Sequence, residues 1–267
     1  MIELDCVLPP GCLCDDTALL ASQLQDAGAL WLRADPASFE LDGDAVQGWN
    51  DRARRRCALP AQPNRGNARL APPDGLGRQA LETRSQTNCG LVLPGVTQDA
   101  TRCTMAVIHR PQPGAAARTL LTLNTRYHQA EDEAEAGYLY LSDDGEQLVA
   151  IDTDTDESLA LTCPDRPDPD GPPRARLAIM GIAGQRLGLM RDGGAMVEIT
   201  ASAPPRRQGT ADLFIGCRSH RKGLHKTLGE THLLEVIFWP GLYLPDPETA
   251  QEQAQLAALL RHFRWEY

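Results

Sequence analysis

The chain has 267 residues, enough for one large β-domain or two small domains. Hydrophobic residues make up 42% of it and charged residues 23%, a balance that is ordinary for a folded globular protein and excludes disorder as the global state. The net charge of −10 argues against nucleic acid and anionic membrane as partners, because both require a basic surface. No apolar run reaches the ~18 residues of a membrane span. We therefore predict no nucleic-acid binding and no membrane insertion.

The N-terminal sequence MIELDCVLPPGCLCDD lacks the positive and apolar segments of a signal peptide. This predicts synthesis in the cytoplasm without a signal for export. It also favours reduced thiols for the eight cysteines, although their pairing stays open. Cys6, Cys12 and Cys14 lie close together, but their spacing differs from that of structural zinc sites.

A helix is predicted near each end of the chain. Residues 15–28 form the first, with an aspartate as its cap, Leu20 and Leu24 on one face, and Gly28 at its end. The second is predicted to begin at Asp246 as N-cap, followed by a proline in the first turn. Its predicted apolar face consists of Leu256, Leu259, Leu260 and Phe263.

Between the helices, short apolar runs separated by clusters of Gly, Asp, Asn and Pro, about ten residues apart, predict strands. These strands are residues 29–33, 103–110, 119–125, 137–143, 146–152, 157–162, 174–182, 185–192, 195–200, 211–217 and 231–239. The pattern predicts an all-β fold, a two-sheet antiparallel β-sandwich with short N- and C-terminal helices. We predict an N-terminal extension with a short helix over residues 1–28, and one domain over residues 29–267 closed by the C-terminal helix.

Apolar side chains two residues apart along the later strands predict the inward face of the sandwich. The residues predicted to be buried between the sheets are Leu177, Ile179, Leu187, Leu189, Leu213, Ile215, Leu234, Val236 and Phe238. Cys103 and Cys217 fall in apolar runs and are predicted as small core residues.

Three stretches of the sequence resemble laminin-G-like domains. RARLAIMGIAGQRLGLMRDGGAMVEI (174–199) is similar to their hairpin series, in which a strand ends in a turn of the form l-y-v-D-G. ADLFIGCRS…LGETHLLEVIFWPGLYLPDPE (211–248) is similar to their closing signature, and ALWLRADPASFELDGDAVQGWNDRA (29–53) resembles their opening. The positions that match the closing signature are Leu213, Ile215, Gly216, Gly229 and Glu235.

This resemblance places the chain near the concanavalin A-like lectin and glucanase superfamily. It implies a two-sheet jelly roll, in agreement with the strands predicted above. It does not imply one function, because this fold carries lectins, hydrolases and structural modules.

Asp152, Asp154 and Asp156 stand two residues apart in IDTDTDE, so on a strand they share one face. Three interpretations fit. Glucanases of the resembled superfamily carry alternating acids, with glutamates at the ends, whose carboxylates act about 5–5.5 Å apart. An oxygen-rich turn also suits calcium. The interpretation we favour is a solvated loop at the rim of a sheet. We predict no cofactor, unless these three aspartates bind calcium.

The loop CRSHRKGLHK (217–226) concentrates basic side chains in an acidic chain. It joins two late strands, and such folds place binding loops at the end of the sandwich. Its predicted ligand-binding residues are Arg218, His220, Arg221, Lys222 and Lys226, with a solvated loop as the alternative. The aromatic residues of the predicted site are Trp49, Tyr138 and Tyr140, with Tyr127 and His128 as further candidates; core packing is the alternative for each.

These features predict a non-catalytic module that binds a glycan, such as an acidic polysaccharide, or a protein partner in an assembly. Modules of the resembled kind occur on bacterial surfaces and on phage-like particles such as tail fibres, head spikes and gene-transfer particles. Without a predicted signal peptide, we expect a released particle, with the cell surface as the alternative. Two other functions stay open: a polysaccharide-cleaving glycoside hydrolase that uses the three aspartates, and a purely structural assembly subunit.

Overall fold

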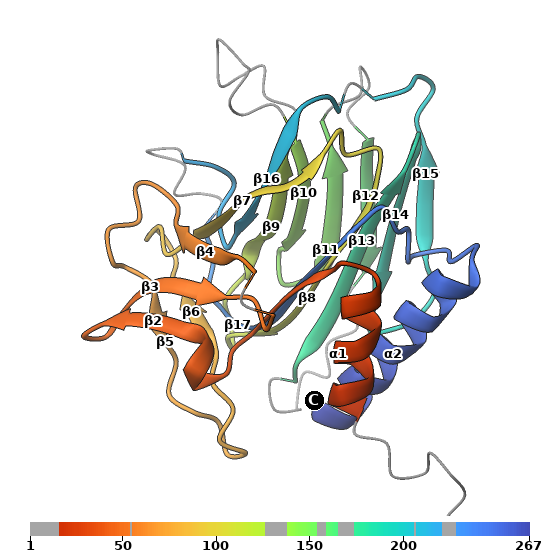
Figure 1. Ribbon diagram of the computed structural model, residues 1–267. Coiled ribbons are helices and arrows are strands. Elements are labelled where there is room, and N and C mark those ends of the chain that lie inside the picture. Colours follow the sequence, from red (N-terminus) through yellow and green to blue (C-terminus); the bar gives the residue numbers. More distant parts are fainter. Residues whose placement is uncertain are drawn as a thin grey trace, which may run out of the picture.

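The computed structural model describes residues 16–53, 55–125, 138–153, 159–164, 174–205, 207–220 and 228–267. In this part of the chain, two antiparallel sheets pack face to face and two helices lie side by side against one of them (Figure 1). The predicted fold class, an antiparallel two-sheet β-sandwich with N- and C-terminal helices, is confirmed.

The eight-stranded sheet has the order β15-β14-β13-β8-β17-β6-β5, with β1 paired to β17. Its strands are β1 (Leu30–Arg33), β5 (Arg69–Leu70), β6 (Leu81–Thr83), β8 (Arg102–Pro111), β13 (Arg176–Ala183), β14 (Arg186–Arg191), β15 (Val197–Thr200) and β17 (Thr231–Pro240). The nine-stranded sheet has the order β12-β11-β10-β9-β16-β7-β4-β3-β2. Its strands are β2 (Phe39–Asp42), β3 (Ala45–Asn50), β4 (Cys57–Pro60), β7 (Leu91–Gln98), β9 (Arg118–Asn124), β10 (Tyr138–Asp143), β11 (Gln147–Asp152), β12 (Leu159–Pro164) and β16 (Thr210–Ile215).

Every predicted strand is confirmed, but β2 to β7 were missed. Three of these strands lack the usual sequence signals of a strand for a physical reason. β5 and β6 are only two and three residues long. β7 contains Pro94 and Gly95, residues that normally interrupt a strand.

Of the predicted core residues, six lie between the two sheets: Leu187, Leu189, Leu213, Ile215, Val236 and Phe238. The placement of Leu177, Ile179 and Leu234 between the sheets is wrong, because they are buried under the helices on the other face of the eight-stranded sheet. Two causes explain the error. This sheet is apolar on both faces, so alternation cannot tell one from the other, and an irregularity between Leu233 and Glu235 shifts the alternation in β17. Cys103 and Cys217 are buried, as predicted.

The helices α1 (Asp16–Asp26) and α2 (Ala250–Glu266) cover the outer face of the eight-stranded sheet. Leu20, Leu24 and Leu259 are buried against it. The N-cap of α2 is Thr249 rather than the predicted Asp246, because Thr249 and Glu252 form a reciprocal capping box. Neither helix has the length and apolar character of a membrane span within the described residues.

Glu235 of β17 links α2 to the eight-stranded sheet and bonds a side chain of the neighbouring strand β1. It is fully buried and accepts hydrogen bonds from Trp31 Nε1 at 2.8 Å and from the Tyr267 hydroxyl at 2.7 Å. His262 Nε2 lies 2.8 Å from the same carboxylate, and Arg33 Nε lies 3.6 Å away. Burial alone raises the pKa of a carboxyl, but these hydrogen bonds and the nearby positive charges hold the pKa of Glu235 below its ordinary value.

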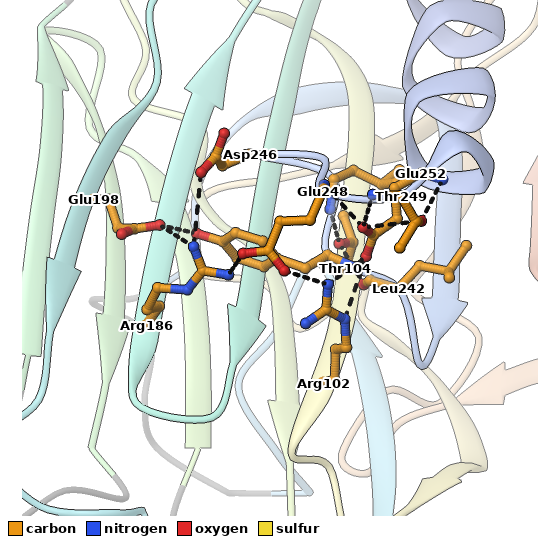
Figure 2. Close-up of polar contacts among 11 residues, drawn as sticks. Arg102, Thr104, Arg186, Glu198, Leu242, Asp246, Glu248, Thr249 and Glu252 are labelled. Carbon is orange, nitrogen blue, oxygen red and sulfur yellow. Dashed lines mark hydrogen bonds and ion pairs between the residues drawn. The ribbon is translucent and has the colours of Figure 1, made fainter.

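The segment from Gly241 to Thr249, between β17 and α2, lies across the outer face of β13 and β14 (Figure 2). A pair of directly opposed glycines, Gly181 and Gly188, leaves room for it. A Cβ added at Gly188 would lie 2.2 Å from the Tyr243 hydroxyl and 2.8 Å from Pro245 Cβ. The missing side chains therefore allow the Tyr243 ring to rest directly on the sheet.

Ion pairs hold the same segment at its margins (Figure 2). Arg186 Nη2 lies 2.5 Å from Glu248 Oε1, and Arg102 Nη2 lies 2.7 Å from Glu252 Oε1. The Tyr243 hydroxyl donates to Glu198 Oε2 at 2.6 Å. These carboxylates and guanidinium groups bind one another, so we interpret the cluster as structural.

Replacing Gly188 by Ala should lower the free energy of unfolding by about 1–3 kcal/mol, because the added methyl group displaces Tyr243 and Pro245. Urea titration measures the change. The matched control is Gly75→Ala, whose Cβ meets nothing within 4 Å and whose backbone needs no left-handed conformation. Equal unfolding midpoints for the two variants would show that the opposed glycines are not what seats the segment.

Candidate functional site

The outer face of the nine-stranded sheet, which points away from the eight-stranded sheet, carries the candidate site. In the central strands, Leu121, Leu139, Leu213 and the apolar residues two positions further along each strand fill the core. The intervening side chains therefore point outward. Strand register puts four of these in one row across β10, β9, β16 and β7. The row consists of Tyr140, Thr122, Phe214 and Val92.

Arg218 lies over Tyr140, at one end of this row, whereas Thr122 and Phe214 are fully buried. Its guanidinium carbon is 3.9 Å from the centre of the Tyr140 ring and 5.7 Å from that of Tyr138. The two tyrosine rings meet edge to face, with centroids 6.5 Å apart. Tyr140 is 6% exposed, whereas Tyr138 is half-buried. A cation on an aromatic face is held by the ring quadrupole, so Arg218 and the two tyrosines form one unit.

The chain after β16 is shaped to bring Arg218 there. Gly216 has φ +69°, a left-handed conformation that glycine adopts without strain. Cys217 then packs against Gly90, where a Cβ would lie 2.2 Å from its sulfur. Burial raises the pKa of the Cys217 thiol to about 12, so this cysteine is an inert packing residue. Arg218 follows at the surface of the sheet.

Two polar atoms at this site are buried without a hydrogen-bond partner in the part of the chain that the structure describes. They are the Thr122 hydroxyl oxygen and Arg218 Nε. Buried polar groups are nearly always paired in folded proteins, with protein, water or ligand. Because Thr122 is the direct cross-strand neighbour of both Tyr140 and Phe214, the unpaired hydroxyl lies within the aromatic row.

The electrostatics of Tyr140 also depend on Arg218. Burial alone raises the pKa of the phenol, but hydrogen bonds with Ser142, Arg218 and Thr119, together with the Arg218 charge, bring the pKa of Tyr140 below its ordinary value. The phenol oxygen is therefore a hydrogen-bonded part of the site rather than a free surface group.

His220 extends the site toward β4. Its ring meets Phe214 edge to face at 5.1 Å, and its Nδ1 accepts a hydrogen bond from the Gln62 amide at 3.0 Å. The structure thus places Arg218 against Tyr138 and Tyr140, and His220 against Phe214 on the same face; their role in ligand binding stays a prediction. Arg221, Lys222 and Lys226 lie outside the described residues, and so do Tyr127 and His128.

Trp49 does not belong to this surface, which corrects its place in the predicted site. It is fully buried, stacks on Phe39 with centroids 5.2 Å apart, and donates to the Arg33 carbonyl at 3.0 Å. The core-packing alternative therefore applies. The sequence alone does not tell whether a tryptophan in a strand lies inside the sandwich or on its outer surface.

The predicted solvated position of Asp152 is also wrong. β11 turns Leu148, Ala150 and Asp152 inward, and Asp152 is fully buried. Its carboxylate pairs with the Arg207 guanidinium, which is 3% exposed. Asp154 and Asp156 lie outside the described residues, so calcium binding by the three aspartates stays a prediction. Within the described ranges, no three His, Cys, Asp or Glu side chains are grouped to hold a metal ion.

A small pocket elsewhere makes a weaker candidate. It lies between β1, the loop before β6 and the end of α2, and Arg33, Arg78 and Tyr267 are among its lining residues. Both guanidinium groups are already paired, Arg33 with Glu266 at 2.8 Å and Arg78 with Asp74 at 2.8 Å. The pocket therefore offers no uncompensated charge to a ligand.

Sequence reasoning missed three residues that shape these sites: Thr122, Phe214 and Arg207. A signal existed for the first two, because the alternation in TLLTLNT and ADLFIG leaves them opposite the core leucines. No signal existed for Arg207, whose partner Asp152 is 55 residues away along the chain.

No model of a known protein family matches the chain, and a search of curated proteins finds no match. Solved structures share its fold. Trypanosoma rangeli sialidase in complex with sialic acid aligns with a TM-score of 0.55 at 14% identity, over 87% of this chain and 32% of the sialidase. This chain thus spans about a third of that enzyme. Domain 4 of AbnA, an arabinanase from Geobacillus stearothermophilus, in complex with arabinotriose, aligns with a TM-score of 0.54 at 10% identity, over 86% of this chain and 96% of the domain.

Mouse laminin alpha1 chain domains LG4-5 align at a TM-score of 0.42 and 13% identity, over 60% of this chain and 40% of that one, too weak a likeness to support an argument. At these identities the likenesses establish the fold alone. The chain is an antiparallel two-sheet β-sandwich, a fold that the aligned parts of the sialidase and the arabinanase share.

Proposed function

We propose that this protein is a glycan-binding module, and that the glycan binds on the outer face of the nine-stranded sheet. The observation that carries the proposal is Arg218 on the ring of Tyr140, next to Thr122 and Phe214 in the same row, with two buried polar atoms that have no partner among the described residues. Sugar recognition uses an aromatic ring for the apolar face of a pyranose and polar groups for its hydroxyls. Both kinds of group meet here, on a rigid sheet.

The fold supports this choice of class. Structural neighbours with TM-scores above 0.5 include a sialidase in complex with sialic acid and an arabinanase domain in complex with arabinotriose. A shared fold alone does not transfer function, so the argument rests on the site. Membership of the laminin-G-like family is part of the proposal, and rests on the sequence motifs described above.

We propose binding rather than cleavage because Asp152, the described member of the acidic series, is held in a buried ion pair. A catalytic carboxylate must reach a substrate, and this one faces the interior. The hydrolase alternative predicts release of reducing sugar from a polysaccharide panel. We expect none, and release that disappeared in Asp154→Asn or Asp156→Asn would establish the enzyme instead.

The setting is a second part of the proposal and rests on the sequence. We propose that the module serves in attachment, on a phage-like particle or at the cell surface, with protein partners in the assembly. Antibody detection in particles purified from lysed cultures tests the setting. Recovery only in the cytosolic fraction would contradict it.

Tyr138 should contribute directly to affinity, because its side chain is more exposed than that of Tyr140 and Arg218 lies farther from it. A glycan array first identifies the ligand. Replacing Tyr138 by Ala should then weaken binding of that ligand by about threefold to tenfold, the effect of losing one ring contact. Titration calorimetry measures it. The control is Trp265→Ala, which removes a ring that is 77% exposed on α2 and should change nothing.

A further inference from the structure

Arg218 occupies the place on Tyr140 that a sugar ring would take. Its guanidinium carbon lies 3.9 Å from the ring centre, which is stacking distance. Tyr140 is accordingly only 6% exposed, although it belongs to the outer face of the sheet. A glycan cannot stack on Tyr140 while Arg218 stays in this position.

The guanidinium group is also incompletely bonded. Arg218 Nε is buried and has no hydrogen-bond partner among the described residues, and the same is true of the Thr122 hydroxyl oxygen beside Tyr140. An arginine normally uses Nε and one Nη together to grip a carboxylate in a two-pronged hydrogen bond. Here Nε has no partner among the described residues, while the guanidinium group also hydrogen-bonds the Tyr140 phenol.

We propose that Arg218 determines specificity by selecting sugars that carry a carboxylate, an inference that rests on the proposed glycan-binding function. In the free protein, Arg218 covers the ring of Tyr140. A carboxylate-bearing sugar draws the guanidinium off the ring into a two-pronged ion pair, and the uncovered ring receives the sugar. The Thr122 hydroxyl then bonds a ligand oxygen.

The preference for acidic sugars follows from the bonds that each ligand can form with Arg218 once Arg218 has left the Tyr140 ring. Moving Arg218 gives up its cation–π contact and its hydrogen bond with the Tyr140 phenol. A carboxylate replaces them with two charge-assisted hydrogen bonds, which are roughly twice as strong as those that a neutral hydroxyl offers. Neutral sugars therefore meet a covered ring that they cannot uncover.

Two substitutions separate the cover from the charge. Arg218→Ala removes both, and Arg218→Met keeps an apolar cover of similar length without the charge. Calorimetry with oligosaccharides of a uronic acid and their neutral counterparts should show acidic binding weakened at least about tenfold in both variants. Neutral binding should strengthen by about threefold in Arg218→Ala alone, where the Tyr140 ring becomes available.

Nitration of tyrosines, mapped by mass spectrometry, reports on the cover without any ligand. Tyr140 should become more reactive in Arg218→Ala than in the native protein or in Arg218→Met. Native protein that binds neutral and acidic oligosaccharides equally would overturn the specificity role and leave the glycan-binding function standing. Native protein that binds neither would overturn both, and unchanged nitration would overturn the cover alone. Thermal unfolding confirms that each variant is folded.

Discussion

Replacing Asp152 by Asn is expected to lower the free energy of unfolding by about 3–5 kcal/mol, the usual effect of leaving one partner of a buried ion pair alone. Asp152 is fully buried and Arg207 is 3% exposed, so water cannot solvate the remaining guanidinium. Arg207 also donates to the Gly184 carbonyl at 3.1 Å, which holds its charge in place. The Asn side chain fits the space but provides no charge.

Urea titration of Asp152→Asn and of the double variant Asp152→Leu with Arg207→Met tests this account. The double variant should be less destabilised than the single one, because it removes both charges. The exposed control Asp42→Asn should change stability by no more than about 0.5 kcal/mol. An Asp152→Asn variant as stable as this control would mean that the ion pair contributes nothing.

Acid should destabilise the fold through His109 before the carboxylates titrate. His109 of β8 is buried, with Nδ1 3.2 Å from the Thr231 hydroxyl and Nε2 3.6 Å from Asp143. Burial lowers the pKa of His109 to about 4; Asp143 opposes the shift and Arg176 adds to it. The folded protein therefore keeps this imidazole neutral at a pH where the unfolded chain binds a proton.

The direction follows from the two pKa values. The folded pKa of about 4 lies below the ordinary value of about 6.5, so the stabilisation is complete above pH ~6.5 and is lost as the pH falls toward 4. The full loss amounts to roughly 3 kcal/mol. The carboxyls with lowered pKa, which are Asp74, Asp144, Glu235 and Glu252, lose most of their contribution below pH ~4.5, so the range above that pH reports mainly on the histidines.

The free energy of unfolding, measured by urea titration between pH 7 and 4.5, should fall steeply in the native protein. The slope should flatten in His109→Gln, which cannot titrate. His232→Gln is the matched control, since His232 is only half-buried; burial also lowers its pKa, which Glu82 opposes and Arg110 supports. If stability fell with pH equally steeply in His109→Gln, His109 would not be the group that makes stability depend on pH.

The sequence predicted those parts of the fold in which local pattern and tertiary structure agree. Strands such as β8 and β17 carry long apolar runs, and both were placed within a residue or two. The core was assigned to the right residues but not always to the right face. Leu177 and Ile179 alternate as core residues do, and only the packing of α1 and α2 decides which layer they fill.

The candidate site was predictable in its composition and not in its geometry. Arg218 and His220 stood out as basic residues of an acidic chain, and Tyr138 and Tyr140 as adjacent aromatics. That Arg218 stacks on Tyr140 depends on the turn at Gly216 and on Cys217 packing against Gly90, which are contacts between distant segments. Trp49 and Asp152 were wrongly predicted to be exposed, because their burial depends on partners that the local sequence does not reveal.

Hydrogen–deuterium exchange with and without the glycan found on the array tests the central claim most directly, because it locates the ligand on the molecule. Peptides from β9, β10 and β16, which carry Thr122, Tyr140 and Phe214, should exchange more slowly when the glycan is bound. Peptides from α2, on the eight-stranded sheet, should not change. Protection confined to α2 or to the segment before it, with β9, β10 and β16 unaffected, would contradict binding on the outer face of the nine-stranded sheet.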